Sequence, residues 1–358
     1  NTGAGNDTIT TLFADLAATG EDDHTINAGA GTDTISISDN AADEAIIDTY
    51  WTNVTGLEKI TLNNDSHDVS MTTGGAFATA FATGAEVTYA AQVDGTFFTL
   101  NAGLYTKDFK FTLTSAAIGS GANEDFNFTT GSGDDTLSLT MDSYLGAGGA
   151  SSGITIDTKA GDDTVTLTSG QLAVMTGSQY LALNTGTGAD TVTLDTTRNG
   201  AAALATAIIT IDAGDSLETS RDKITGFELG DTTNFCDTLD FTGTSTVGTL
   251  GTSTDYGVIK SHSVGTGVAK FDDAATYATE LIVNANNLTD VLGYLEANSD
   301  ALETFAFAYD STGNGSNDAM MVWNNGATTN SLVELAGVTT VEGLVTSNAT
   351  TENGICLA

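Results

Sequence analysis

Short segments in which apolar and polar residues alternate recur along the chain. They occupy residues 126–129, 154–157, 181–184 and 209–212, and a second alternating run follows most of them, as at 136–140. Alternation with a period of two predicts strands with one buried face. The sequence therefore predicts many short strands that recur in pairs.

A glycine-rich motif joins the two strands of a pair. It reads G-x-G-x-D-T-[ILV], with one departure, and occurs in five copies, of which Thr130-Gly-Ser-Gly-Asp-Asp135-Thr-Leu is one. A degenerate copy begins at residue 213, where an insertion delays the acid to Asp222. The copies that begin at residues 130, 158, 185 and 213 are 27 or 28 residues apart. Such spacing is typical of a solenoid, whose repeats bury their apolar faces by stacking.

Composition supports an all-β fold and restricts the partners. The 358 residues include 41 glycines and no proline, which suits short strands joined by tight turns. Forty-seven acidic residues stand against nine basic ones, for a net charge of −38. Nucleic acid and anionic lipid need a basic surface, so neither is an expected partner. No apolar run is long enough to span a bilayer, so we expect no membrane insertion.

Stacked coils would bring the closing acids of the motif into a column. Equivalent turns would lie about 4.8 Å apart, where two bare carboxylates repel by roughly 3 kcal/mol at an effective dielectric near 20. Calcium would relieve this repulsion, because it takes six to eight oxygens from carboxylates and carbonyls. Glycine allows the positive φ that turns carbonyls toward an ion. The alternative is a turn that caps itself with an Asx hydrogen bond.

The motif resembles the repeats-in-toxin (RTX) nonapeptide G-G-x-G-x-D-x-[LIVF]-x, found in proteins that leave bacteria by type I secretion and bind calcium in a parallel β-roll. Two departures are consistent: the first glycine is Thr or Ala in every copy, and Lys159 replaces the second glycine once. Family motifs run in tandem, whereas here whole strands separate them. We therefore expect a wider coil with the same turn chemistry.

The resemblance implies a set of calcium ligands, formed by motif acids and glycine carbonyls. They are Gly5, Asp7, Gly31, Asp33, Gly133, Asp135, Gly161, Asp163, Gly188 and Asp190. Asp157 and Asp212, each one residue ahead of a turn, are further candidates. Residues 222–242 resemble the D-x-I-x-x-F-x-x-G…D-x-L-D-F element that often closes such arrays, which adds Asp222 and Asp237. An ordinary strand and turn is the alternative for this element.

Residues 243–358 lack the glycine motif and predict a smaller mixed β/α domain. We expect a helix over 289–301 and strands at 304–309, 319–323 and 331–335. The loop between the first two strands contains Asp310, Asn314 and Asp318, whose spacing suits another calcium ion, with a hairpin turn as the alternative. This end also resembles the C-terminal region of type I secreted proteins, which carries an uncleaved export signal.

The expected domains are N-terminal coils at 1–68, a degenerate β segment at 69–129, a calcium-binding solenoid at 130–242 and the C-terminal domain at 243–358. Because the chain opens inside a repeat, we expect it to be part of a longer protein. Cys236 and Cys356 are the only cysteines, and the sequence leaves open whether they pair or remain free thiols.

No catalytic constellation is visible in the sequence. His24, His67 and His262 do not form an H-E-x-x-H zinc motif, and no G-x-S-x-G elbow occurs. Residues 53–62 resemble a strand motif of bacterial surface-layer and type I secreted surface proteins. The resemblances therefore favour a structural, calcium-dependent surface-layer or scaffold protein, extracellular at the bacterial cell surface, whose main partner is itself. A calcium-dependent adhesin or matrix protein that binds glycans or other cells is the alternative, followed by a secreted carboxylate hydrolase.

Overall fold

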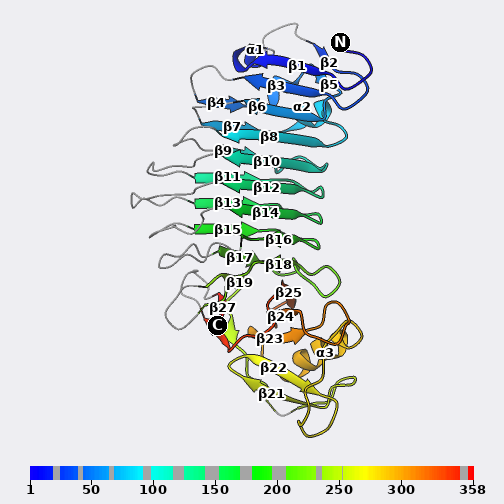
Figure 1. Cartoon of the computed structure of the whole chain (residues 1–358), viewed down its shortest axis with the longest axis vertical. Helices are drawn as coiled ribbons and strands as arrows, with labels where there is room; N and C mark the ends of the chain where they lie inside the picture. Colours follow the sequence, from blue (N-terminus) through cyan, green and yellow to red (C-terminus); the bar gives the residue numbers. More distant parts are fainter. Residues whose placement is uncertain are drawn as a thin grey trace. The chain divides into compact units, whose positions relative to one another are not determined.

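The computed structural model describes residues 1–18, 25–38, 43–63, 68–91, 98–115, 125–141, 153–169, 180–195, 207–230, 236–251, 253–346 and 354–358. The described chain is nearly all β and forms a parallel β-solenoid, as the repeat predicted (Figure 1). Its residues divide into two compact units: the first runs to Thr185 and the second begins at Gly186. Among the described residues, no helix is long and apolar enough to cross a membrane.

The first unit consists of stacked coils with one strand in each of two parallel sheets (Figure 1). One sheet contains, in spatial order, β1 (Thr8–Leu12), β3 (Thr34–Ser38), β6 (Lys59–Asn63), β8 (Ala85–Ala91), β10 (Phe109–Ser115), β12 (Thr136–Met141) and β14 (Thr164–Ser169). The other contains β15 (Tyr180–Asn184), β13 (Gly153–Asp157), β11 (Asp125–Thr129), β9 (Phe98–Asn101), β7 (Val69–Thr72) and β4 (Glu44–Ile46). A small separate pair joins β2 (Ile26–Asn27) to β5 (Val54–Thr55).

The core of the first unit is a set of in-register apolar columns. Ile60, Val87, Phe111 and Leu137 lie opposite one another on successive strands and are fully buried. The second sheet contributes Phe98, whose ring centroid lies 4.8 Å from that of Phe111. The alternating pattern thus places the apolar face of each strand inside the coil. Stacking then covers this face with side chains of the neighbouring coils.

Residues 69–129 lack the motif acids, but their described strands are nevertheless in register with those of the neighbouring coils. The short helix α2 (Gly75–Ala80) lies in this segment and packs against η2 (Asp48–Trp51), which precedes it in the chain. Trp51 packs edge-on against Phe77 and Phe81, at centroid distances of 5.6 and 5.3 Å. Aromatic side chains thus pack beside these coils, and a further short helix, α1 (Phe13–Ala18), follows β1.

The second unit begins with parallel strands and ends with antiparallel ones. Its larger sheet contains β16 (Thr191–Thr193), β18 (Lys223–Thr225), β25 (Ser331–Ala336), β24 (Ala319–Asn324), β23 (Glu303–Tyr309), β22 (Val268–Asp272) and β21 (Ser261–Gly265), with β20 (Thr246–Val247) beside β23. Its smaller sheet contains β17 (Ala207–Ile211), β19 (Thr238–Phe241), β27 (Ile355–Leu357) and β26 (Leu344–Thr346). The pairing becomes antiparallel between β25 and β24 and between β19 and β27.

The helix and the three strands predicted after residue 288 are confirmed as α3 (Leu288–Asn298), β23, β24 and β25. They enclose a core that includes Phe305, Phe307 and Trp323. The division into compact units falls near residue 185, within the segment that the repeat grouped as one solenoid. The reason is that β18 pairs with β25, 111 residues later in the chain by their register (Lys223 with Glu334), which no local pattern encodes.

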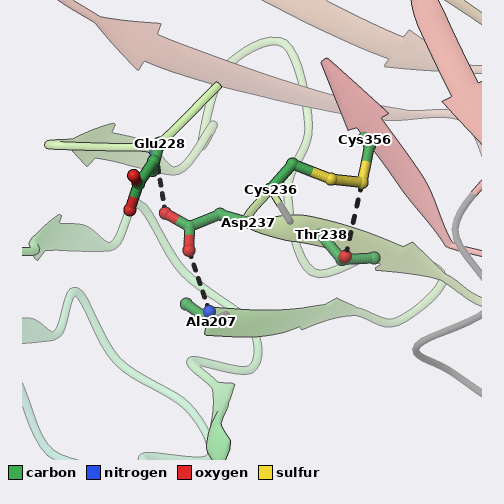
Figure 2. Close-up of a disulfide and its surroundings, with 6 residues drawn as sticks. All are labelled: Ala207, Glu228, Cys236, Asp237, Thr238 and Cys356. Atoms are coloured by element: carbon green, nitrogen blue, oxygen red, sulfur yellow. Dashed lines mark hydrogen bonds between the residues drawn. A yellow bond between two sulfur atoms is a disulfide. The ribbon is translucent and has the colours of Figure 1, made fainter. Parts of the chain in front are cut away.

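The two cysteines form a disulfide, which decides the question that the sequence left open (Figure 2). Cys356 lies on β27, opposite Thr238 of β19, and the Cα atoms of Cys236 and Cys356 are 5.9 Å apart. The bond therefore fastens the last described strand to a strand 120 residues earlier in the sequence.

Candidate calcium-binding turns

The closing acids of the motif lie in the turns, each directly before a strand of the larger sheet. Asp7 is partly exposed, and five others are buried. These are Asp33, Asp135, Asp163, Asp190 and Asp222. The position is fixed because the next residue begins a strand whose register is set by the apolar columns. The column of acids that the repeat predicted is therefore present within each unit.

Backbone hydrogen bonds connect each closing acid to the coil before it. The N–H of Asp7 donates to Oδ1 of Asp33 at 2.8 Å, and the N–H of Asp135 donates to Oδ1 of Asp163 at 2.7 Å. In the second unit, the N–H of Asp190 donates to Oδ1 of Asp222 at 3.2 Å. One carboxylate oxygen of each acceptor therefore has a partner in a neighbouring coil. Oδ2 of Asp135 also accepts the N–H of Gly131 within its own turn at 3.1 Å, a contact of the kind that the self-capped alternative predicts.

Coils without a complete motif keep the same connection. The N–H of Asp33 donates to Oε2 of Glu58 at 2.7 Å, and the N–H of Phe109 donates to Oδ1 of Asp135 at 2.7 Å. Sequence reasoning missed Glu58, although it stands 25 residues after Asp33, at the period of the repeat. That spacing was the available signal.

A second set of hydrogen bonds runs in the opposite direction, from the residue that precedes the closing acid. Oδ1 of Asp108 accepts the N–H of Asp134 at 3.2 Å, and Oδ1 of Asp134 accepts the N–H of Asp162 at 2.9 Å. Asn6 accepts the N–H of Thr32 in the same way, at 2.9 Å. The paired acids of the motif therefore accept hydrogen bonds from opposite neighbours along the stack.

The threonine that replaces the first glycine of the family pattern also has a structural role. The hydroxyl of Thr130 donates to the carbonyl of Thr158 at 3.2 Å, and the hydroxyl of Thr158 donates to the carbonyl of Thr185 at 2.9 Å. Both donors are fully buried. The turns at 130–135 and 158–163 are thus joined by three kinds of side-chain hydrogen bond.

The motif glycines are required by close stacking of the turns. A Cβ on Gly161 would lie 2.0 Å from the carbonyl oxygen of Gly133, and one on Gly31 would lie 2.1 Å from that of Gly5. Four of the five predicted carbonyl ligands have positive φ: Gly5 at 123°, Gly31 at 146°, Gly161 at 135° and Gly188 at 149°. Gly133 does not. The carbonyls of Gly5 and Gly133 thus face the next coil along the stack.

The second oxygen of several closing acids is the feature that fits a cation. Oδ2 of Asp7, Asp33 and Asp222 is buried and has no hydrogen-bond partner among the described residues. A buried carboxylate oxygen without a partner is costly, and burial disfavours its charge. Burial raises the pKa of Asp135 to about 6, and burial together with the nearby Asp190 raises that of Asp222. A bound cation would oppose both effects.

The donor set in the turns would therefore be carboxylate and carbonyl oxygen, which calcium accepts. Within the described residues, no group of three or more His, Cys, Asp or Glu side chains converges to hold a metal. Ligation in these turns would accordingly depend on backbone carbonyls as much as on the acids.

Three of the additional candidates have protein partners that occupy their oxygens. Asp157 forms an ion pair with Lys159, a residue that itself has positive φ. Oδ1 of Asp212 accepts the hydroxyl of Thr242 at 2.9 Å. Asp237 accepts the N–H of Ala207 on Oδ1 and that of Glu228 on Oδ2, each at 2.8 Å (Figure 2). Both carboxylate oxygens of Asp237 thus accept backbone N–H groups of neighbouring segments, as expected if this element is an ordinary strand and turn.

The loop after β23 is organised around Asp310. Its Oδ2 accepts the N–H of Gly315 at 2.7 Å, and its Oδ1 accepts that of Asn314 at 3.1 Å. Asn314 in turn accepts the N–H of Ser316 at 2.8 Å. Asp318 accepts the N–H of Ser311 at 2.8 Å, and its hydrogen bonds to Ser311 lower its pKa to about 2. These contacts describe a turn closed by its own acids, and calcium in this loop stays a prediction.

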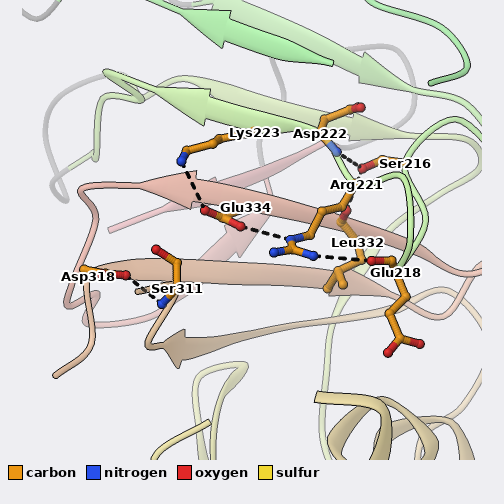
Figure 3. Close-up of polar contacts among 9 residues, drawn as sticks. All are labelled: Ser216, Glu218, Arg221, Asp222, Lys223, Ser311, Asp318, Leu332 and Glu334. Carbon is orange, nitrogen blue, oxygen red and sulfur yellow. Dashed lines mark hydrogen bonds and ion pairs between the residues drawn. The ribbon is translucent and has the colours of Figure 1, made fainter. Parts of the chain in front are cut away.

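Close to the closing acid Asp222, the second unit contains an ion pair that the sequence did not reveal (Figure 3). The N–H of Asp222 donates to the hydroxyl of Ser216 at 2.7 Å. Next to it, Nε of Arg221 lies 2.9 Å from Oε2 of Glu334, and Nζ of Lys223 lies 3.7 Å from Oε1 of the same residue. The only hint of this ion pair in the sequence was that Lys and Arg residues are rare.

Neither a protein-family model nor a curated protein nor a solved structure gave a significant match to this chain.

Proposed function

We propose that this chain is a structural protein of the extracellular space, stabilised by calcium in its solenoid turns, which assembles with further copies of itself into a bacterial surface layer or a related scaffold. The observation that carries the proposal is the closing acids in the turns of each unit, where Oδ2 of Asp7, Asp33 and Asp222 is buried and has no partner among the described residues. Hydrogen bonds from the described residues leave these carboxylate oxygens without a partner, and calcium would supply one.

The net charge of −38 also supports a bound cation. Self-repulsion of this size destabilises a compact state, and the described basic residues neutralise little of it. If each site binds with an affinity near 0.1 mM, then 10 mM calcium stabilises the fold by roughly 2.7 kcal/mol per occupied site. Several sites together would exceed the stability of a typical domain.

The disulfide supports a location outside the cytoplasm. Disulfide bonds persist in oxidising surroundings and are rare where thiols are kept reduced. A chain that gains both its disulfide and its calcium outside the cell would leave the cytoplasm unfolded and fold on arrival. This order of events is part of the proposal, and it agrees with the resemblance to proteins that leave by type I secretion.

The test is electron microscopy and circular dichroism of the same purified chain, with millimolar calcium and with chelator. Ordered sheets or filaments that appear only with calcium, together with a gain of β signal, are the expected result. Magnesium at the same concentration is the control, because its preference for octahedral geometry suits these turns poorly. A chain that stays folded and resistant to protease in chelator would contradict calcium-dependent folding.

A calcium-dependent adhesin that binds glycans is the second candidate. The observation in its favour is a pocket in the second unit that is lined by two carboxylates and several hydroxyls and bounded by an aromatic ring. Calcium-driven folding without any assembly would favour this candidate over the scaffold.

A further inference from the structure

The second unit contains a pocket of about 300 Å³ beside α3. We call it the Tyr256 pocket, and it is lined by Tyr256, Gly293, Trp323, Glu218, Glu296 and Asn330, among others. These residues come from the turn before β18, the turn before β21, helix α3 and the β24–β25 hairpin. Glu218 lies in the insertion of the degenerate motif copy that ends at Asp222, and the other five residues lie outside the motif turns.

Tyr256 is an exposed ring that its surroundings hold in place. The residue is 45% exposed, and its backbone exchanges two hydrogen bonds with Ile259, at 3.1 and 2.9 Å. Asp290 at the start of α3 accepts the N–H of Val258 at 2.9 Å, which ties the turn to the helix. A large aromatic ring that stays partly exposed on a fixed turn offers a preformed surface for a ligand.

Gly293 makes this arrangement possible. A Cβ at this position would lie 2.2 Å from the ring of Tyr256. The ring therefore lies directly against the backbone of the helix. Glycine inside a helix costs about 1 kcal/mol relative to alanine, so the close contact is obtained at a loss of helix stability.

The polar side chains that line the pocket are two carboxylates, an amide and several hydroxyls. Glu218 and Glu296 contribute carboxylates, and Asn330 contributes an amide. Glu218 already accepts the hydroxyl of Thr289, which shows that its carboxylate faces a hydroxyl donor. No Lys or Arg is among the described residues that line the pocket.

A ligand that suits these walls has several hydroxyl donors and an apolar face. The hydroxyls of a sugar ring can donate to the carboxylates while its C–H face lies on the tyrosine ring. An anionic sugar would meet two carboxylates on a chain of net charge −38, which disfavours it. The volume lies at the lower end of the range for small-molecule sites, which suits one or two sugar units.

We propose that the Tyr256 pocket binds a neutral pyranose unit of a polysaccharide. For a scaffold it would provide attachment to a surface polysaccharide, and for an adhesin it would be the recognition site. The proposal goes beyond calcium binding and does not depend on it, because the Tyr256 ring and the α3 residues that line the pocket lie outside the motif turns. A chain that is stable in chelator and still binds sugar would reject the proposed calcium dependence and keep the pocket.

The test is isothermal titration calorimetry of the full chain with a fixed panel of probes. The neutral probes are oligosaccharides of glucose, of mannose and of galactose, and the charged probe is anionic oligogalacturonate. We expect at least one neutral probe to bind and the anionic probe to bind at least ten-fold more weakly. Binding of no neutral probe, or preferred binding of the anionic one, would overturn the proposal.

Three variants locate the binding in the pocket. Tyr256→Ala removes the ring, and Gly293→Ala displaces it while favouring the helix, so both should weaken the neutral probe at least ten-fold. Tyr256→Phe keeps the ring and should retain most of the affinity. Val258→Ala is the matched control, because this residue lies in the same turn, is 47% exposed and does not line the pocket. Unchanged affinity in both Tyr256→Ala and Gly293→Ala would overturn the proposal, whatever sugar binds.

Discussion

The backbone N–H of Asp135 donates to Oδ1 of Asp163, one coil later, at 2.7 Å. This contact gives the motif acid a structural role that is independent of any metal. It also leaves the metal question open to experiment, because a hydrogen-bond acceptor and a calcium ligand respond differently to the same substitution.

Replacing Asp33 separates the two roles. Asp33→Asn keeps an oxygen that can accept the N–H of Asp7, whereas Asp33→Ala leaves that N–H without its partner. In chelator, we expect Asp33→Ala to lower the free energy of unfolding by about 1–3 kcal/mol and Asp33→Asn to change it by less than about 1 kcal/mol. With 10 mM calcium, the Asp33→Asn variant should also lose the contribution of one calcium site to the free energy of unfolding, roughly 2.7 kcal/mol. Urea unfolding measures each value, and an Asn variant that responds to calcium as the parent chain does would exclude Asp33 as a ligand.

Replacing Gly161 tests the stacking of the turns. Gly161→Ala introduces a Cβ about 2 Å from the carbonyl oxygen of Gly133 at a φ of 135°, so we expect a loss of more than about 2 kcal/mol in the free energy of unfolding. Gly75→Ala is the matched control in the same unit, because a Cβ there meets nothing within 4 Å. Urea unfolding followed by circular dichroism gives both values. Equal stability of the two variants would contradict the close approach.

The buried acids should make the calcium-free protein less stable as the pH rises. The pKa of Asp135 is raised to about 6 by burial, above its value of about 3.9 in an unfolded chain. The folded state therefore holds this proton more tightly, and the associated stability is present below about pH 4 and is lost as the pH rises through about 6. Urea unfolding in chelator between pH 4 and 7 should show the decline.

Two comparisons identify the source of that decline. Asp135→Asn should flatten the profile, because the substituted side chain does not titrate in this range. Calcium should oppose the decline, since it favours the charged carboxylates. A profile that is the same in the parent chain and in Asp135→Asn would assign the pH dependence to other groups.

The ion pair beside Asp222 should matter far more through Arg221 than through Lys223. The Glu334 side chain is only 5% exposed, and Arg221 approaches it at 2.9 Å, whereas the half-exposed Lys223 stays at 3.7 Å (Figure 3). Removing the close partner of a buried charge is strongly destabilising, so we expect Arg221→Ala to cost about 2 kcal/mol or more. Lys223→Ala should cost less than about 1 kcal/mol. Thermal unfolding of the two variants provides the comparison, and a larger effect at Lys223 would contradict the geometry.

The disulfide should stabilise the second unit in particular. Because it joins cysteines 120 residues apart, the chain-entropy treatment gives an upper value of about 5 kcal/mol. A double Cys236→Ser, Cys356→Ser variant should release β27 from β19 and expose the end of the chain to protease. Limited proteolysis with mass spectrometry would detect this release. Equal protection of the C-terminal strand in the variant and in the oxidised parent would contradict the role of the bond.

The sequence by itself determined the coil of this protein. Period-two alternation and glycine spacing placed the paired strands, and the in-register columns through Ile60 and Leu137 follow from that pattern. The same repeat located the closing acids in the turns. Such features are local and recur once per coil, so every copy supplies the same evidence.

Only the tertiary structure decided which atoms each acid meets. The direction of the Asp135–Asp163 hydrogen bond depends on the register between coils, and the role of Glu58 appears only when the coils are stacked. The pairing of Lys223 with Glu334, the disulfide and the position of Tyr256 against Gly293 join segments far apart in the chain. A sequence pattern reports the period and the buried face of each element, whereas contacts of this kind depend on how distant elements pack together.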